Sequence, residues 1–136
     1  MKQYIFKVYP KGKGRECYRI IHISGKETLD RLCEVILDAF GFVDEHLYEF
    51  CMNNRMYEED NYQSDPDTEY QESTKEKIDR LQLVKGQKFS LHYDFGDDWM
   101  FVISVQGINE TDENIMPYIT QEKGFLIQYP DCEEFE

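Results

Sequence analysis

An acidic corner in the second half of the sequence holds the densest set of groups that could do chemistry. Asp94, Asp97 and Asp98 fall within five residues around Gly96, and Trp99 follows at once. Because Ca²⁺ and Mg²⁺ prefer carboxylate oxygens, the three aspartates form a weak candidate metal site. The same composition is typical of a tight turn, in which glycine takes a positive φ and aspartates accept hydrogen bonds from backbone N–H groups. The turn is the preferred interpretation, and no metal or other cofactor is expected.

The three histidines are the next candidates, because imidazole titrates near neutral pH and binds metals. His22, His46 and His92 each lie outside any H-x-x-x-H or H-E-x-x-H pattern. Their spacing therefore assigns none of them to a metal or to catalysis. His46 begins a strand pattern and suits a structural hydrogen bond, whereas His92 is expected across the hairpin or beside Asp94.

Arg19 and Trp99 complete the candidate polar site. Arg19 lies in an apolar strand pattern, where its planar guanidinium group could clamp a ligand carboxylate or phosphate. The preferred alternative is an internal pair with Asp94 or Asp97. Trp99 could line a pocket, but an anchor between sheet and helix is preferred. The candidate polar site thus combines basic, imidazole, carboxylate and indole side chains: Arg19, His46, Asp94, Asp97, Asp98 and Trp99.

A sheet and one helix must position these groups. Alternating or apolar runs bounded by turn residues predict strands over residues 2–9, 17–23, 46–52, 88–94 and 99–106. Thr28 is a suitable N-cap and Gly41 a suitable C-terminal stop for a helix over residues 28–40. The apolar residues of this helix recur at three- and four-residue spacing and share one face: Leu29, Leu32, Cys33, Ile36, Leu37 and Phe40.

The predicted fold class is α+β. We expect a mainly antiparallel or mixed sheet of about five to six strands with one principal helix packed on it. The order is strand, strand, helix, strand, followed by a hairpin. A short helical turn is expected over residues 78–83. At 136 residues, the chain is expected to form one domain spanning 1–136.

The negative charge is concentrated in two segments. The chain has a formal net charge of −13, to which residues 53–78 contribute −5 (three bases, eight acids) and residues 109–136 contribute −7 (one base, eight acids). We interpret the first as an exposed acidic insertion and the second as an acidic tail. Such charge disfavours direct nucleic-acid binding. It suits solubility, or docking of a protein with a basic surface.

The cysteines and the N-terminus predict a cytoplasmic protein. Cys17, Cys33, Cys51 and Cys132 form no C-x-x-C pair, and the chain shows neither a signal-peptide pattern nor an apolar run of membrane-spanning length. Cys33 and Cys51 lie in apolar patterns, which disfavours either as a nucleophile. No membrane association is expected, and the oligomeric state is left open.

Two blocks of sequence resemble the family named after the third open reading frame of the Ri plasmid. The family shares a Phe-Gly-Trp…His-Leu-Tyr-x-Phe block and a Tyr-Asp-Phe-Gly-Asp-x-Trp block. The matching segments here are Tyr4–Val8, Thr28–Leu32, Ala39–Phe42, His46–Phe50 and Tyr93–Trp99. The resemblance implies a shared α+β fold and a bacterial or archaeal distribution, but no specific reaction.

The chain departs from the family pattern at three positions. Cys33 and Phe101 stand where members usually have histidine, and Ile20 replaces the second of two arginines that usually follow an aromatic residue. The Pro-Pro-Glu-Asp and Gly-Gly segment of the family is absent, although Tyr129–Cys132 is similar to the sequence leading into it. The resemblance therefore implies that a polar site built on those histidines is incomplete here.

Three functions are consistent with these features. The favoured one is a small binding or protein-interaction module, because no catalytic constellation accompanies the acidic segments. The first alternative is a metal-assisted hydrolase that uses Asp94, Asp97 and Asp98 with His46 or His92. The second alternative is an acidic nucleic-acid mimic.

Overall fold

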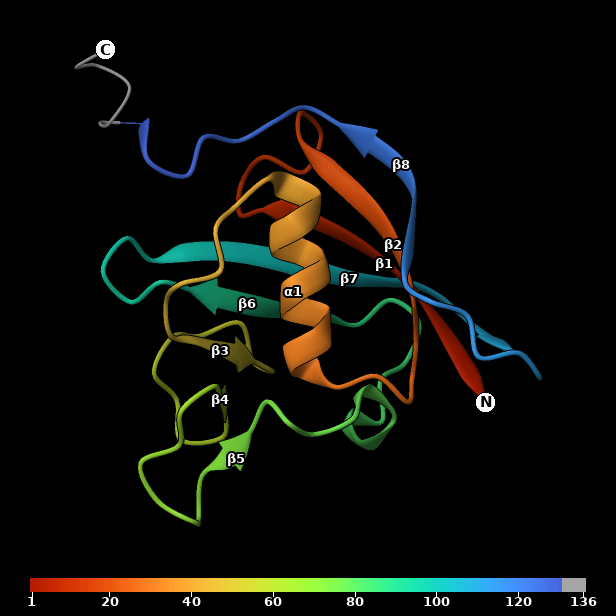
Figure 1. The fold of residues 1–136 in the computed structure, drawn as a ribbon, viewed down its shortest axis with the longest axis horizontal. Coiled ribbons are helices and arrows are strands. Elements are labelled where there is room, and N and C mark those ends of the chain that lie inside the picture. Colours follow the sequence, from red (N-terminus) through yellow and green to blue (C-terminus); the bar gives the residue numbers. More distant parts are fainter. Residues whose placement is uncertain (131–136) are drawn as a thin grey trace.

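The core of the molecule is a single large sheet with one α-helix against it. A computed structural model describes residues 1–130, and Figure 1 shows its arrangement. The helical elements are α1 (Leu29–Phe40) and the 3₁₀ turn η1 (Ile78–Leu81). The strands are β1 (Lys2–Pro10), β2 (Tyr18–Ser24), β3 (Tyr48–Cys51), β4 (Tyr62–Gln63), β5 (Glu72–Ser73), β6 (Lys88–Tyr93), β7 (Trp99–Glu110) and β8 (Tyr118–Lys123).

The strands lie in the order β5-β4-β3-β6-β7-β1-β2-β8. All neighbours are antiparallel except β4 and β5, which are parallel. β1 and β7 form the long centre of the sheet. The α+β class and the order strand, strand, helix, strand, hairpin are confirmed.

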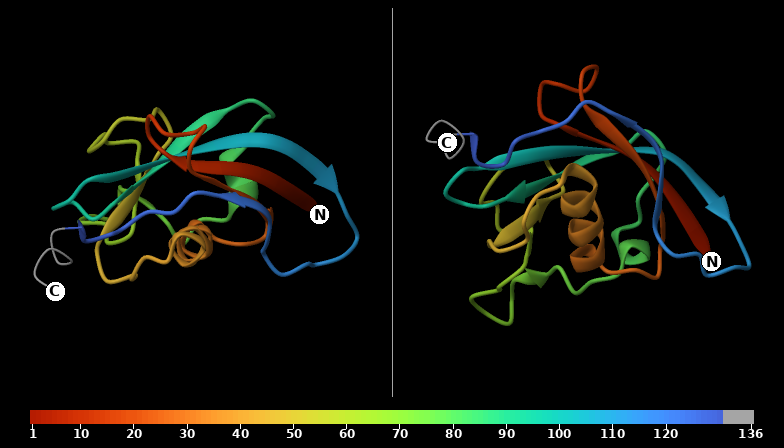
Figure 2. Two further views of the ribbon diagram at one scale, coloured as in Figure 1. Left: turned by 90° about the horizontal axis from the view of Figure 1, so that it is seen from above. Right: turned by 45° about the horizontal axis from the view of Figure 1, so that its top comes forward.

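The period-two patterns sort the side chains between the two faces of the sheet. In β1, Tyr4, Phe6 and Val8 are buried, whereas the alternate residues Ile5 and Lys7 are half-buried. The left view of Figure 2 shows α1 against one face of the sheet. In β1 the buried apolar set belongs to this helix-covered face and the alternate set lies on the opposite, open face, whereas β3 and β6 bury residues on both faces.

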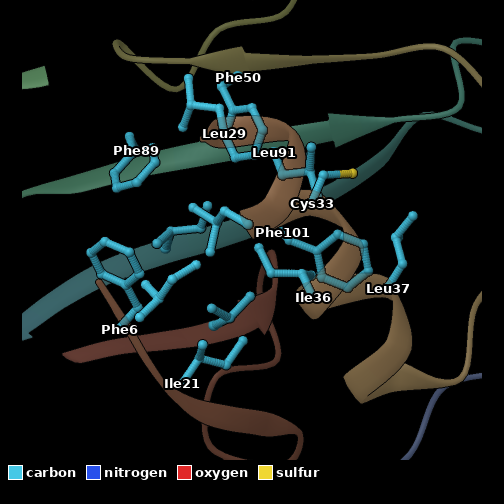
Figure 3. Close-up of a cluster of buried hydrophobic side chains, with 14 of the residues drawn as sticks. Phe6, Ile21, Leu29, Cys33, Ile36, Leu37, Phe50, Phe89, Leu91 and Phe101 are labelled. Carbon is cyan, nitrogen blue, oxygen red and sulfur yellow. The ribbon is translucent and has the colours of Figure 1, made fainter. Parts of the chain in front are cut away.

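Helix α1 begins and ends where local chemistry predicts. The Thr28 hydroxyl accepts a hydrogen bond from the Arg31 backbone N–H at 3.1 Å. Gly41 has φ 74°, the left-handed conformation that ends a helix cheaply only without a Cβ. All six predicted apolar positions are buried. Figure 3 shows Cys33 and Ile36 directed toward the sheet, where Phe101 lies.

The sheet has eight strands, so the expected five to six was too few. β4 and β5 lie inside the segment read as an exposed insertion, and two residues are too few to show a period of two. β8 lies inside the acidic tail, and all six of its residues are exposed, so no hydrophobic alternation marks it. Pairing with neighbouring strands, rather than burial, defines these three strands.

The boundaries of two predicted strands also change. β7 runs to Glu110, four residues beyond its predicted end, because its outer part pairs with the start of β1. The third strand is shorter than predicted and spans Tyr48–Cys51. Residues 131–136 of the acidic tail, with Cys132, lie outside the described residues. No helix within residues 1–130 has the length and apolarity to cross a membrane.

Candidate functional site

The acidic corner is a turn closed by its own aspartate. Asp94 Oδ1 accepts hydrogen bonds from the backbone N–H groups of Gly96 at 3.0 Å and Asp97 at 3.3 Å. The left-handed residues are Asp94, with φ 65°, and Asp98, with φ 53°, so the expected positive φ at Gly96 was wrong. Aspartate tolerates this conformation because its short side chain bonds locally. Tight-turn geometry therefore accounts for Asp94 without a ligand.

Asp98 instead belongs to a chain of hydrogen-bonded titratable groups on the open face. His92 Nδ1 lies 2.7 Å from Glu49 Oε2, and His92 Nε2 lies 2.6 Å from Asp98 Oδ1. The side chains of Glu49 and His92 are fully buried, whereas that of Asp98 is 45% exposed. The imidazole ring thus lies between the two carboxylates, with one ring nitrogen at hydrogen-bond distance from each. We call Glu49, His92 and Asp98 the buried relay.

Glu49 is the residue of this corner that the sequence did not reveal. Its carboxylate also accepts hydrogen bonds from the Tyr57 backbone N–H and from the Asn61 and Gln63 amides, each at 2.9 Å. Burial raises the pKa of Glu49, but these bonds and the one from His92 outweigh burial and lower it overall. The expected acidic insertion thus supplies donors to a buried carboxylate. A lone glutamate in an aromatic strand gave no signal of this role.

Aromatic rings cover the imidazole of the buried relay. The Tyr57 ring meets His92 edge-on at 5.2 Å, and the Phe95 ring is tilted against it at 4.9 Å. Both rings also contact each other at 5.5 Å. They shield the imidazole from water, which strengthens its bonds to the carboxylates.

His46 has a separate set of partners at the other side of the turn. Its Nε2 lies 2.6 Å from the Tyr129 hydroxyl and 3.5 Å from Asp94 Oδ2. The Tyr129 hydroxyl donates to Glu45 at 2.8 Å, and this bond, followed by burial, raises the pKa of Tyr129 to about 12. His46 therefore ties the corner to the chain after β8. Its expected structural role is consistent with these contacts.

The side chain of Arg19 bonds to other parts of the chain, not to the acidic corner, so the expected pair with Asp94 or Asp97 was wrong. Its guanidinium group donates to the backbone carbonyls of Ala39 at 3.0 Å and of Tyr18 and Lys123 at 2.9 Å each. It also lies over the Phe40 ring at 4.6 Å. Arg19 thereby joins the last turn of α1 to the end of β8.

Trp99 lies half-buried between the sheet and the segment after α1. Its ring meets Phe42 edge-on at 4.9 Å and stacks on Phe101 at 6.1 Å. These contacts fit the preferred anchoring role. Its other side borders a hollow of about 460 Å³ lined by charges of both signs and by apolar side chains: Pro10, Lys11, Lys13, Met56, Asp97, Asp98, Trp99, Met100 and Leu126.

The six predicted site residues do not converge on one point. Asp94 and His46 meet, Asp98 turns to His92, and Arg19 bonds to backbone carbonyls. Within residues 1–130, no three histidine, cysteine, aspartate or glutamate side chains are grouped so that they could hold a metal ion. Burial raises the pKa of Cys51 to about 12 and raises that of Cys33 well above its usual value. Both thiols are therefore poor nucleophiles.

A second concave surface lies between α1 and the start of β8, where the sequence predicted no site. This acidic groove has a volume of about 470 Å³. Its lining combines three carboxylates, one arginine and several apolar side chains: Arg31, Glu34, Val35, Leu37, Asp38, Phe42, Asp44, Pro117, Tyr118 and Ile119. Little in the sequence indicated this groove, because the two walls of the groove are far apart in the chain and β8 was not predicted.

The carboxylates of the acidic groove are close enough to influence one another. Partial burial of the Asp44 carboxyl group, and then the charges of Glu34 and Asp30, raise its pKa. Glu34 is neutralised by Arg31, whose guanidinium group lies 3.0 Å away. Asp38 and Asp44 form no salt bridge within residues 1–130. The groove is therefore anionic, and among the described residues Arg31 compensates only Glu34.

Comparison with known proteins now places the chain. Residues 2–130 match the family model of the plasmid pRiA4b ORF-3-like proteins. The chain belongs to this family. No curated protein matches the sequence. A crystal structure of a protein of unknown function from Methanosarcina mazei Go1 has a similar fold, with a TM-score of 0.72 and 24% sequence identity over 89% of this chain and 68% of the other.

Two of the departures from the ORF-3-like pattern, Cys33 and Phe101, lie in the core. Cys33 and Phe101 are fully buried between α1 and the sheet, and Phe101 contacts the rings of Phe40 at 5.2 Å and Phe42 at 5.7 Å. At these two positions, buried apolar side chains replace the histidines that family members usually have. For this member, the family resemblance therefore supports a shared fold and a structural turn at the acidic corner.

Proposed function

We propose that this ORF-3-like protein is a protein-interaction module that binds a basic segment of a partner in the acidic groove. The observation that carries the proposal is a hollow in which Asp38 and Asp44 lack cationic partners within the described chain, beside exposed apolar side chains. Tyr118 and Ile119 are 41% and 39% exposed there. Such a surface offers charge complementarity and an apolar contact together.

Electrostatics favours a cation as the occupant. The raised pKa of Asp44 reports that its ionised form is disfavoured by burial and by neighbouring carboxylates. A lysine or arginine side chain in the groove would remove this repulsion and add a charge-assisted hydrogen bond. The partner would therefore bind more tightly at low ionic strength, because salt screens exposed charges.

The groove also suits an extended segment. β8 is the last strand of the sheet, so one of its backbone edges has no strand partner among residues 1–130. An edge of this kind can pair with an added strand, whose main-chain bonds supply affinity while side chains supply specificity. Alternate residues of a basic segment would then face the carboxylates of α1.

The corner supports binding over metal-assisted hydrolysis as the function. Asp94 is engaged by backbone N–H groups and Asp98 by His92, so these carboxylates face different partners. A hydrolytic site needs its groups to converge on one reacting atom. A nucleic-acid mimic needs a regular array of charges, whereas the groove carries a cluster of three carboxylates with one arginine.

A peptide titration with matched charge variants tests the proposal. The probe is a fluorescently labelled peptide of about ten residues that alternates lysine or arginine with leucine or tyrosine. The test variant carries Glu34→Gln, Asp38→Asn and Asp44→Asn. The control variant carries Glu58→Gln, Glu59→Gln and Asp60→Asn, which remove the same number of negative charges from the acidic insertion.

We expect the groove variant to weaken peptide binding at least about tenfold and the control variant to change it less than about twofold. A peptide with glutamate in place of each basic residue should not bind. Equal losses in the two variants would show non-specific attraction to an acidic protein and would contradict a site in the groove. Saturable binding unaffected by either variant would contradict it as well.

A further inference from the structure

The open face of the sheet carries a basic groove that none of the preceding functions uses. It has a volume of about 460 Å³ and lies on the side of the sheet opposite α1. Its lining includes four cationic side chains and one carboxylate: Lys7, Lys13, Arg15, Lys88 and Glu16. In a chain with a formal net charge of −13, such a group of cations is unexpected.

Strand register places two of these cations in a row with a hydroxyl. Ser104 in β7 is the cross-strand partner of Lys7 in β1 and also of Lys88 in β6. The three side chains therefore share one face, and adjacent strands lie about 4.8 Å apart. Ser104 thus lies between the two lysines in the sheet, and the Gln106 amide donates a hydrogen bond to its hydroxyl at 3.2 Å.

The loop between β1 and β2 adds the other two cations. A Cβ at Gly14 would lie 3.0 Å from the Tyr9 ring, so glycine lets the loop pack closely on this ring. The close approach brings Lys13 and Arg15, on either side of Gly14, to the wall of the groove. Three strands, β1, β6 and β7, and one loop thus converge on the same hollow.

The four cations have no salt-bridge partner in the part of the chain that the structure describes, although Glu16 also lines the groove. None of Lys7, Lys13, Arg15 and Lys88 takes part in a salt bridge within residues 1–130. The Lys7 ammonium group lies over the Tyr18 ring at 4.7 Å from its centroid, which holds it at the surface of the sheet. Like charges held together in this way favour binding of a multiply charged anion.

We propose that the basic groove is a binding site for the phosphate group of a small molecule. Ammonium and guanidinium groups around a hydroxyl and an amide match the charge and the acceptor oxygens of phosphate. The volume suits a ligand up to about the size of a mononucleotide. A long nucleic acid is disfavoured, because the acidic segments beyond the groove would repel the rest of its backbone.

The test is a titration of the full chain with inorganic pyrophosphate and, separately, with adenosine monophosphate. Isothermal titration calorimetry measures affinity, and NMR amide shifts of Ser104 and Gln106 locate the ligand. Lys7→Met and Lys88→Met remove one charge each and keep the apolar stem. Lys75→Met, which removes an exposed lysine near β5 at the far end of the sheet, is the matched control.

We expect each groove variant to weaken pyrophosphate binding at least about fivefold and the control to change it less than about twofold. Binding of pyrophosphate, with or without binding of adenosine monophosphate, supports a phosphate site. Whether adenosine monophosphate also binds then distinguishes an inorganic from an organic phosphate ligand. No saturable shift at about 10 mM of either ligand, far weaker than a functional site requires, would overturn the proposal. So would an equal loss in Lys75→Met, or binding of a single-stranded oligonucleotide without binding of either small ligand.

Discussion

The acidic corner and the acidic groove are both rich in carboxylates, but they differ in what compensates those carboxylates. In the corner, Asp94 accepts hydrogen bonds from two backbone N–H groups, and Asp98 Oδ1 lies 2.6 Å from His92 Nε2. In the groove, Asp38 and Asp44 are exposed and form no salt bridge within the described chain, and the charges of Glu34 and Asp30 act on Asp44. Acidic sequence alone therefore does not distinguish carboxylates that are satisfied within the protein from carboxylates that are exposed and without a salt bridge.

The difference follows from where each set of charges lies. A buried carboxylate must be paired and hydrogen-bonded, because its desolvation is otherwise prohibitive. Glu49 meets this requirement with four donors from two other segments. Exposed carboxylates face no such requirement, so they remain available to a partner. Substitutions in the two regions should accordingly act on different properties.

The largest effect is expected at Glu49. Glu49→Gln replaces a fully buried carboxylate that accepts four hydrogen bonds, the one with His92 included, and should lower the free energy of unfolding by about 3 kcal/mol at pH 7. Urea unfolding followed by tryptophan fluorescence measures this change. Glu34→Gln, an exposed substitution of the same type, is the control and should alter stability by less than about 0.5 kcal/mol. A cost as small as that of the control would mean that the buried relay does not support the fold.

The pH dependence of stability sharpens this result. The pKa of Glu49 is lowered in the folded protein below its ordinary value of 4.5. Its contribution is therefore fully present above that value and is lost as the pH falls through the lowered pKa. Between about pH 5 and pH 3, the wild type should lose stability more steeply than Glu49→Gln. Parallel curves for the two proteins would contradict the lowered pKa.

Arg19 links α1 to β8, the two elements that form the walls of the acidic groove. Arg19→Met keeps contact with Phe40 but removes the bonds that tie α1 to the end of β8, and should cost about 2 kcal/mol. Because α1 and the start of β8 form the two walls, the same variant should weaken binding of the basic peptide. Arg19→Lys should not restore either property, since an ammonium group cannot reproduce the planar fork. Unchanged peptide affinity in a destabilised Arg19→Met would separate the groove from this link.

A smaller effect is expected at Asp94. Asp94→Ala removes the acceptor for two backbone N–H groups and leaves at φ 65° a side chain that cannot hydrogen-bond locally, at a cost of about 1 to 2 kcal/mol. Asp94→Asn keeps an acceptor oxygen and tolerates the left-handed conformation, so it should cost less than half as much. Thermal unfolding compares the pair. Equal costs would indicate that charge, rather than turn geometry, explains this residue.

The smallest effect should have the opposite sign. The raised pKa of Asp44 means that its ionisation opposes folding, so Asp44→Asn should raise stability at pH 7 by a few tenths of a kcal/mol, a small amount because solvent screens the charge. The advantage should disappear as the pH falls and the wild-type carboxyl group takes up a proton. Differential scanning calorimetry at pH 7 and pH 4 checks both points. A destabilised variant at neutral pH would argue that Asp44 is already compensated.

Local patterns in the sequence determined much of this protein. The alternation of Tyr4, Phe6 and Val8 and the spacing of apolar residues in α1 fix which faces are buried, because each periodicity matches one backbone geometry. The family blocks likewise predicted the α+β class and the element order. The segments with no such pattern, β4, β5 and β8, depend on partners elsewhere in the chain and were not predicted.

Tertiary structure alone decided what the charged residues do. Glu49 meets His92 from 43 positions away, and Arg19 reaches Lys123 across 104 positions. Sequence spacing cannot encode such meetings, since strand order and register bring the groups together after the chain has folded. The same holds for the two grooves, whose walls come from different elements. Charge composition determined that this protein is acidic, but only pairing in space decided which charges are satisfied and which remain free to bind.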